Sequence, residues 1–257
     1  MSNPTVSYTG AQWLKMSPGD GWIPCEQGTY TYGVCSTKET VFKATSVKEV
    51  YTLWKEKSQG YSLFRVYRNA YSSPHKVELR VEVFVYNKQC SDMTFEVRDK
   101  HNILCAQVRY HLEDGLLHWH RLIPSVSPDN KSVQELDQNT LILPLMRNFL
   151  GPLICKVAAQ EGGKAPLIVP ELSDPNADSV FTPKQEVRKA NLVSDLLDNI
   201  TLGERTWNCR TYRFIGGPYD HRSIFWVCQQ SKRLIRYIFH VDSGERWSVE
   251  LTELNTF

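Results

Sequence analysis

The stretch over residues 104–122 constrains the fold most, because its pattern specifies a β-hairpin together with its register. Asp114 and Gly115 stand between two alternating segments, and this pair favours a type I′ turn, whose twist matches that of the flanking strands. Residues at equal distances from the turn then lie opposite each other and share a face of the sheet. The predicted pairs are Leu112 with Leu117, His111 with His118, Tyr110 with Trp119, and Arg109 with His120.

Alternation of apolar and polar residues, which is typical of half-buried strands, recurs on both sides of this hairpin. Residues 77–86 show it most clearly, because valine and leucine alternate there with charged residues. Two helices are expected, over 46–57 and 183–199, where a capping box accompanies apolar residues at helical spacing. Loops are expected over 124–138 and 162–182. The predicted strands are 62–67, 77–86, 92–98, the two hairpin arms, 205–215, 222–230, 233–241 and 246–253.

These elements predict a mainly β protein of the α+β class. About nine strands form a curved antiparallel sheet or a barrel-like meander, with two helices packed at one side. We expect one β-rich domain over 1–257. The alternative is an internal division near residue 160, into an N-terminal meander, 1–160, and a helix with a C-terminal meander, 161–257. The apolar but interrupted segment 141–159 is expected to form a mobile cover.

Composition narrows the classes of function. The chain is 41% hydrophobic and 23% charged, as in an ordinary soluble globular protein. Its formal charge of +2 comes from interleaved acidic and basic residues, so no nucleic-acid partner is expected. Residues 1–20 lack the pattern of a secretory signal, and no apolar run is long enough for a transmembrane segment. Seven scattered cysteines without a CxxC motif indicate reduced thiols and a cytoplasmic protein.

The histidine face of the hairpin carries the sharpest chemical signal. His118 and His120 project to the same side of one strand, and His111 joins them from the neighbouring strand. Three neutral imidazoles with an open fourth position describe a catalytic zinc site, whereas Arg109 beside them would repel a cation. No HExxH motif surrounds the group. We therefore expect no metal and no other cofactor; a zinc site, a polar ligand-facing site and a solvated face are the alternatives.

A second candidate is the segment over 216–221, which reads GGPYDH. Asp220 and His221 could act as an acid–base pair, and a glycine-rich loop could cradle an anion. The segment lacks the strand-to-helix context of phosphate-binding loops. A tight connection between two strands explains the same residues.

Aromatic residues recur on the strands of both meanders, and such side chains line apolar ligand pockets as well as cores. Four of them are predicted to line a cavity between the sheet and its cover, and two arginines are predicted to meet the polar end of a ligand. These ligand-binding candidates are Tyr110, Trp119, Tyr237 and Phe239, with Arg109 and Arg236.

The expected architecture resembles calycin-like barrels and half-barrel lipid carriers, although the lipocalin GxW signature is absent. The sequence therefore predicts a barrel-like protein that binds a small, largely apolar or amphipathic molecule in a hydrophobic pocket. One alternative is a non-catalytic interaction module that uses a sheet edge or the loop over 162–182. The other is an enzyme acting on such a molecule, with metal-ligating or acid–base candidates His111, His118, His120, Asp220 and His221.

Overall fold

The computed structural model describes residues 8–36, 38–58, 60–71, 77–86, 89–124, 126–137, 139–172, 179–216 and 222–257. Within these ranges, sixteen strands and two α-helices are formed. The first strands are β1 Trp22–Ser36, β2 Lys43–Glu56, β3 Ser62–Tyr71, β4 Val77–Tyr86, β5 Gln89–Arg98, β6 Leu104–Glu113, β7 Leu116–Ile123 and β8 Val126–Glu135. The others are β9 Leu141–Ile142, β10 Lys164–Pro170, β11 Pro183–Leu192, β12 Asp198–Leu202, β13 Arg205–Ile215, β14 Ile224–Cys228, β15 Leu234–His240 and β16 Glu245–Thr256. The helices are α1 Gly10–Lys15 and α2 Arg147–Ala158, and a 3-10 turn covers Glu161–Gly163.

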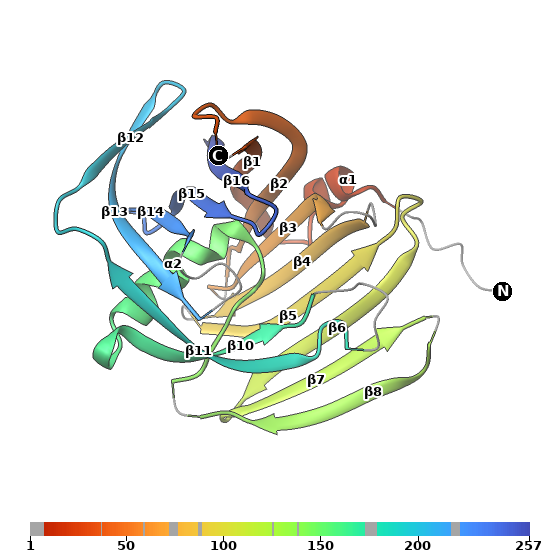
Figure 1. Ribbon diagram of the computed structural model, residues 1–257. Helices are drawn as coiled ribbons and strands as arrows, with labels where there is room; N and C mark the ends of the chain where they lie inside the picture. The colour runs from red at the N-terminus through yellow and green to blue at the C-terminus, as the bar shows by residue number, and fades with distance from the viewer. Residues whose placement is uncertain are drawn as a thin grey trace.

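All the strands belong to one continuous sheet. Its order is β8-β7-β6-β5-β4-β3-β2-β1-β16-β15-β14-β13-β11-β10-β9, and β12 pairs with β13 beside this path. The β1–β16 pair joins the N-terminal meander to the C-terminal strands. Within the described residues the end strands, β8 and β9, do not pair with each other, so the sheet is strongly curved but not closed (Figure 1).

The prediction of a curved, mainly antiparallel sheet is confirmed, and the prediction of about nine strands is wrong, because several segments predicted as helices or loops are strands. The predicted helix over 46–57 is β2, and the one over 183–199 is β11 followed by β12. The predicted loops over 124–138 and 162–182 contain β8 and β10.

Strand β2 imitates a helical pattern because it is buried on both faces. It lies between β1 and β3 and pairs with both. Glu49 and Tyr51 are buried on one face. Thr52 and Trp54 are buried on the other. When large side chains are needed on both faces, their spacing no longer follows a period of two and can match a helix.

The segment over 183–199 forms strands instead of the predicted helix for a different reason. The apolar stripe predicted for it comprises Val187, Ala190, Val193 and Leu197; Ala190 is buried, and the other three are exposed. The main chain of β11 pairs with β10 on one side and with β13 on the other. Pairing on both sides satisfies its N–H and C=O groups, so no helical hydrogen bonds are needed.

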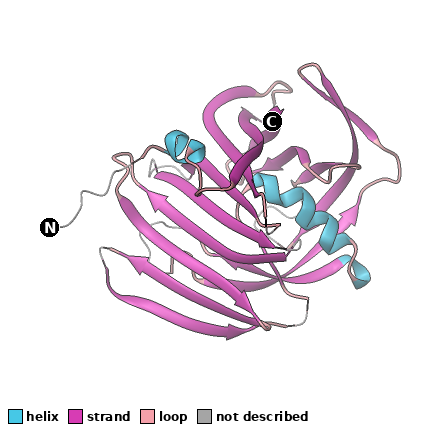
Figure 2. Ribbon diagram, turned by 180° about the vertical axis from the view of Figure 1, so that it is seen from behind, coloured by secondary structure: helices cyan, strands magenta, loops and turns pink. Residues whose placement is uncertain are grey.

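Helix α2 lies within the curve of the sheet (Figures 1 and 2). It packs against β10, β11, β14 and β15, and the ring of Phe149 meets that of Phe64 on β3, with 5.2 Å between their centroids. The helix and the sheet therefore share one apolar core. Fully buried members of this core include Met146, Ile154, Leu167 and Phe181.

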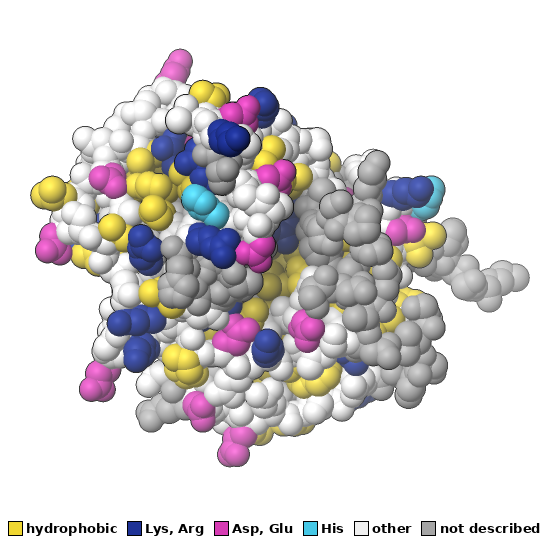
Figure 3. Space-filling view, viewed as in Figure 1, with side chains coloured by type: hydrophobic (Ala, Val, Ile, Leu, Met, Phe, Trp, Pro, Cys, Tyr) yellow, Lys and Arg dark blue, Asp and Glu magenta, His cyan; other side chains and the backbone are white. Residues whose placement is uncertain are grey.

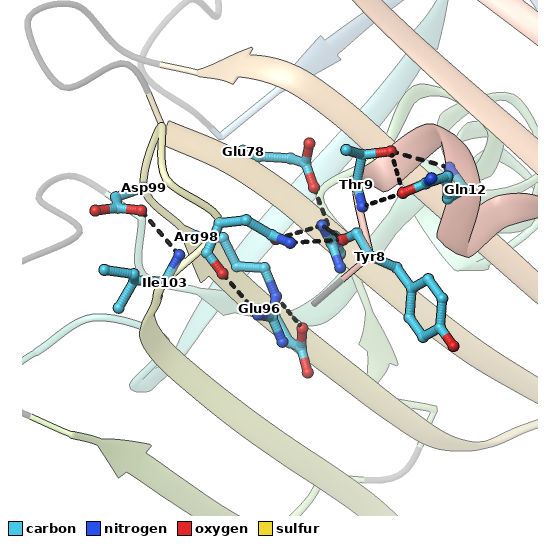
Figure 4. Close-up of polar contacts among 10 residues, drawn as sticks. Tyr8, Thr9, Gln12, Glu78, Glu96, Arg98, Asp99 and Ile103 are labelled. Atoms are coloured by element: carbon cyan, nitrogen blue, oxygen red, sulfur yellow. Dashed lines mark hydrogen bonds and ion pairs between the residues drawn. The ribbon is translucent and has the colours of Figure 1, made fainter. Parts of the chain in front are cut away.

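The N-terminal segment packs on the other face of the sheet. Thr9 begins α1 with a capping box. The main-chain carbonyl of Tyr8 accepts hydrogen bonds from Arg80 and Asn102, both at 2.7 Å (Figure 4). The guanidinium group of Arg80 also lies 5.6 Å from the ring centroid of Trp13. The helices α1 and α2 therefore lie on opposite faces of the sheet, and neither corresponds to a predicted helix, since 46–57 and 183–199 form strands.

Candidate functional site

The central hairpin has the predicted turn and register. Asp114 and Gly115 have φ angles of 50° and 80°, the two positive values that a type I′ turn requires. The predicted cross-strand pairs are all present: Leu112 with Leu117, His111 with His118, Tyr110 with Trp119, and Arg109 with His120.

The histidine face of this hairpin lines an open outer pocket of about 400 Å³. The ring centroids of His111 and His118 are 6.2 Å apart. Nδ1 of His111 lies 2.8 Å from Oδ1 of Asp92, and its Nε2 lies 3.8 Å from Oε2 of Glu113. Acidic neighbours therefore engage the His111 ring. The pocket is lined by Arg109, His111, His118, Trp119, His120, Lys131, Ser132 and Val133.

The histidines do not converge on a metal position. The described residues contain no group of three or more His, Cys, Asp or Glu side chains that could hold a metal ion. Asp92 lies directly opposite His111 in the ladder between β5 and β6, which explains why the His111 ring turns toward that carboxylate. The other acid–base candidates, Asp220 and His221, lie outside the described residues.

Tyr110 faces the interior of the curved sheet, where a chain segment ending at Thr182 crosses it. Its hydroxyl donates a hydrogen bond to the main-chain carbonyl of Phe181. Burial raises the pKa of the Tyr110 phenol, and the nearby Arg121 charge lowers it by less. Arg121 donates a hydrogen bond to Oγ1 of Thr182 at 2.9 Å. Tyr110 therefore fastens this segment to the sheet.

Tyr237 and Phe239 belong to an aromatic ladder on the inner face of the C-terminal strands. Their rings stack with centroids 4.9 Å apart, and both residues are buried. The guanidinium group of Arg147 lies 5.2 Å from the Tyr237 centroid. Arg236 points to the opposite face, where its Nε lies 2.8 Å from Oε1 of Glu250. The ladder and Arg236 thus have protein partners in this structure.

A larger pocket, here named the α2 groove, opens between the β6–β7 turn and the last turns of α2. Its volume is about 710 Å³. Most of its wall is apolar, and polar groups stand around it. The less polar lining residues are Tyr86, Cys90, Leu112, Gly115, Leu141, Ile142, Leu153 and Ala159. The polar ones are Ser91, Glu113, Asp114, Thr140, Lys156 and Gln160.

The wall of the α2 groove is uncharged, whereas its rim carries charged side chains. Burial raises the pKa of the Cys90 thiol to about 12; Asp92 adds to this effect and Lys156 opposes it. A neutral thiol behaves as a small apolar group, so Cys90 extends the apolar wall. Lys156 supplies a positive charge and hydrogen-bond donors at the rim, and Glu113 and Asp114 supply negative charge. The groove can hold a molecule with an apolar body and a polar end.

Buried charges hold the first turn of α2. Met146 precedes the helix without forming a side-chain cap. Instead, Glu49 on β2 accepts a hydrogen bond from the main-chain N–H of Arg147, the first residue of the helix. The other Glu49 oxygen lies 3.4 Å from the Tyr32 hydroxyl and 3.9 Å from Arg68. Burial raises the pKa of Glu49, against the opposing charges of Arg68 and Arg147.

The sequence pattern singles out the segments that surround the α2 groove, but it does not predict that they form a groove. The segment over 141–159, predicted as a cover, contributes β9 and α2 to the lining. The hairpin contributes Leu112 and the turn at Asp114 and Gly115. The predicted ligand-binding residues all lie outside this lining. Leu112 is predicted in the core, but it lines the groove instead. Its place depends on where α2 ends relative to the hairpin, and the local sequence pattern does not contain that information.

The outer surface is mixed in character. On the face drawn in Figure 3, Lys and Arg side chains are interspersed with Asp and Glu, and apolar side chains stand among them. Exposed aliphatic residues include Val193, Leu196 and Leu197, between β11 and β12. In the described part of the chain, none of the helices has the length and apolar character needed to cross a membrane.

Comparison with known proteins identifies a shared fold. No protein-family model and no curated protein matches the chain. Among solved structures, the chain is similar to a β-barrel-like protein of the domain of unknown function DUF1849 from Brucella abortus. The two share 11% identity with a TM-score of 0.53, over 91% of this chain and 98% of that one. At this identity the likeness shows the fold alone.

A second solved structure is more distant. It is a LolA superfamily protein from Nitrosomonas europaea, with 10% identity and a TM-score of 0.22 over 91% of this chain and 86% of that one. A TM-score this low supports no inference about the present chain.

Proposed function

We propose that the protein binds a small amphipathic molecule in the α2 groove. The observation that supports this most is an apolar wall, formed by leucine and isoleucine from three elements, in a pocket of about 710 Å³. Small-molecule sites have this size and this combination of apolar walls with a few polar groups. The apolar part of the ligand would lie against Leu112, Ile142 and Leu153.

The polar end of the ligand is expected to be anionic. Lys156 is exposed at the groove and has no ion-pair partner among the described residues. Of the two carboxylates that also line the groove, Glu113 lies 3.8 Å from the His111 ring, and Asp114 belongs to the β6–β7 turn. A carboxylate or phosphate could therefore reach the free ammonium group of Lys156, and an alkyl acid is the simplest ligand of this kind.

Calorimetric titration with dodecanoate, and with dodecanol as its uncharged counterpart, tests the proposal. Ile142→Trp fills the groove while leaving the main-chain pairing of β9 intact, and it should weaken binding of both compounds at least about tenfold. Lys156→Gln should weaken dodecanoate binding about fivefold, as for an exposed ion pair, and leave dodecanol binding unchanged.

Leu122→Trp is the matched control, because Leu122 is exposed on the outer face of the same hairpin. It should bind both compounds as the unsubstituted protein does. Absence of binding by the unsubstituted protein, or equal binding by Ile142→Trp with an unchanged circular dichroism spectrum, would exclude the α2 groove as the site.

A further inference from the structure

Two cysteines lie directly opposite each other in the C-terminal part of the sheet. Cys209 on β13 pairs with Cys228, the last residue of β14. Both are free thiols, with 0% and 6% of their surface exposed. The other cysteines in the described ladders have different partners: Cys35 faces Arg246, and Cys90 faces Val85.

The hydrogen bonds show which kind of cross-strand pair this is. The N–H of Cys228 donates to the carbonyl of Arg233 at 2.8 Å, and the carbonyl of Cys228 accepts from the N–H of Lys232 at 3.0 Å. The main-chain groups of Cys228 therefore point toward β15 and away from Cys209. The next pair along, Asn208 and Gln229, is bonded, with 2.9 Å between the Gln229 nitrogen and the Asn208 oxygen. Cys209 and Cys228 thus form a non-hydrogen-bonded pair.

Non-hydrogen-bonded pairs bring opposite residues closest together. Their Cα atoms are about 4.5 Å apart, compared with about 5.5 Å in hydrogen-bonded pairs. Disulfides span Cα separations from about 4.4 to 6.8 Å, so the backbone already has a compatible spacing. We propose that Cys209 and Cys228 are a redox site, which a small peroxide converts into a reversible cross-strand disulfide.

The two thiols have different surroundings, and this difference indicates which one reacts with peroxide and which one resolves the product. Burial raises the pKa of Cys228, but polar groups of the turn after β14, Ser231 above all, outweigh it and hold the pKa below its ordinary value. Burial, Cys228 and Asp198 raise the pKa of Cys209 to about 12. Because the thiolate is the nucleophile, Cys228 reacts with peroxide and Cys209 resolves the product.

The chemistry balances with hydrogen peroxide as the oxidant. The Cys228 thiolate attacks one peroxide oxygen, the O–O bond breaks, and a sulfenic acid forms as hydroxide leaves and takes up a proton to become water. The sulfur of Cys209 then attacks the sulfur of Cys228, its thiol proton is lost, and a second water leaves. Two thiols are oxidised to one disulfide, and one peroxide is reduced to two waters.

The cysteine pair lies next to the turn against which α2 packs. Cys228 opens the turn to β15, and a Cβ atom at Gly151 of α2 would overlap the carbonyl oxygen of Lys232 in that turn. A bond between Cys209 and Cys228 would join β13 to the turn that supports the helix. Oxidation is therefore expected to slow amide exchange in this turn and in the adjoining part of α2.

Peptide mapping of the full chain tests the proposal. The protein is treated with hydrogen peroxide, blocked with N-ethylmaleimide, digested with trypsin and analysed by mass spectrometry. Trypsin releases Cys209 within residues 206–210 and Cys228 within 223–232, and neither peptide contains another cysteine. We expect these two peptides to be linked, with the loss of two of the seven alkylatable thiols, and dithiothreitol should restore both.

The variants separate this pair from general thiol oxidation. Cys209→Ser should abolish the linked peptide and leave a sulfenic acid at Cys228 that dimedone traps. Cys35→Ser, which removes a cysteine that faces Arg246, should leave the linked peptide unchanged. Full alkylation of Cys209 and Cys228 after peroxide treatment, or linkage of either to a different cysteine, would overturn the proposal. Peptide mapping of the unsubstituted protein is sufficient to test the proposal, so the test remains valid even if a variant fails to fold.

Discussion

At the scale of single residues, Glu49 shows how one buried side chain serves two elements. Its carboxylate belongs to β2, yet it satisfies the first N–H of α2. Removing a charged group from water is costly unless opposite charges and hydrogen bonds surround it. Arg68 and Arg147 supply the opposite charges, and Tyr32 lies within reach of the same carboxylate. This residue therefore couples the position of the helix to the sheet.

Glu49→Ala should lower the free energy of unfolding by about 3 kcal/mol, because it removes the buried carboxylate that faces Arg68 and Arg147 and it uncaps α2. Urea denaturation followed by circular dichroism measures this loss. Glu82→Ala is the control: Glu82 pairs with Arg65 nearer the surface, at 2.6 Å, and its removal should cost about 1 kcal/mol or less. Equal losses in the two variants would contradict a special role for Glu49.

At the scale of elements, α2 can approach the turn after β14 only because Gly151 has no side chain. A Cβ atom there would overlap the carbonyl oxygen of Lys232 and the nitrogen of Leu234, which are main-chain atoms that cannot rotate away. Glycine in a helix interior is otherwise unfavourable by about 1 kcal/mol relative to alanine. Close packing on the turn thus explains a residue that helix propensity disfavours.

Gly151→Ala should therefore destabilise the protein, by about 2 kcal/mol, although alanine is the better helix former. Thermal unfolding monitored by circular dichroism gives the sign of the effect. Pro152→Ala in the same helix is the control, because Pro152 is exposed and its replacement should leave stability unchanged or raise it. A more stable Gly151→Ala variant would show that the helix has room to move outward.

The accuracy of sequence-based prediction differs between elements for physical reasons. The hairpin register follows from the turn at Asp114 and Gly115, which is local chemistry, and it is confirmed in full. Strands with one regularly apolar face, such as β4, also follow from their alternation. Strand β2 is mispredicted because both of its faces are buried, a property set by neighbours distant in sequence. The α2 groove could not be predicted either, because its wall combines three segments that are separate in sequence.

At the scale of the whole molecule, the β1–β16 pair joins the two ends of the chain. Register runs from Glu26 opposite Thr256 to Ser36 opposite Glu245, so the pairing extends along most of both strands. The apolar core is likewise continuous between the N-terminal strands, α2 and the C-terminal strands. Contacts between segments so far apart in sequence favour one cooperative folding unit.

We therefore expect the meander over 1–160 and the remainder of the chain to unfold together. Amide hydrogen exchange across a urea series, read separately from peptides of β5 and β14, should give the same transition midpoint for both. A lower midpoint for one of them would instead support two units divided near residue 160.

The opposite ends of α2 have unequal constraints. Glu49 holds its first turn and Gly151 packs against the turn after β14, whereas Lys156 and Ala159, near its other end, border the groove. On its other side the same end of the helix packs in the core, where Ile154 and Val157 are fully buried. For the ligand that we propose, adjustment to different widths would therefore come from the exposed side of this end, at Lys156 and Ala159, while its buried side and the sheet keep their shape.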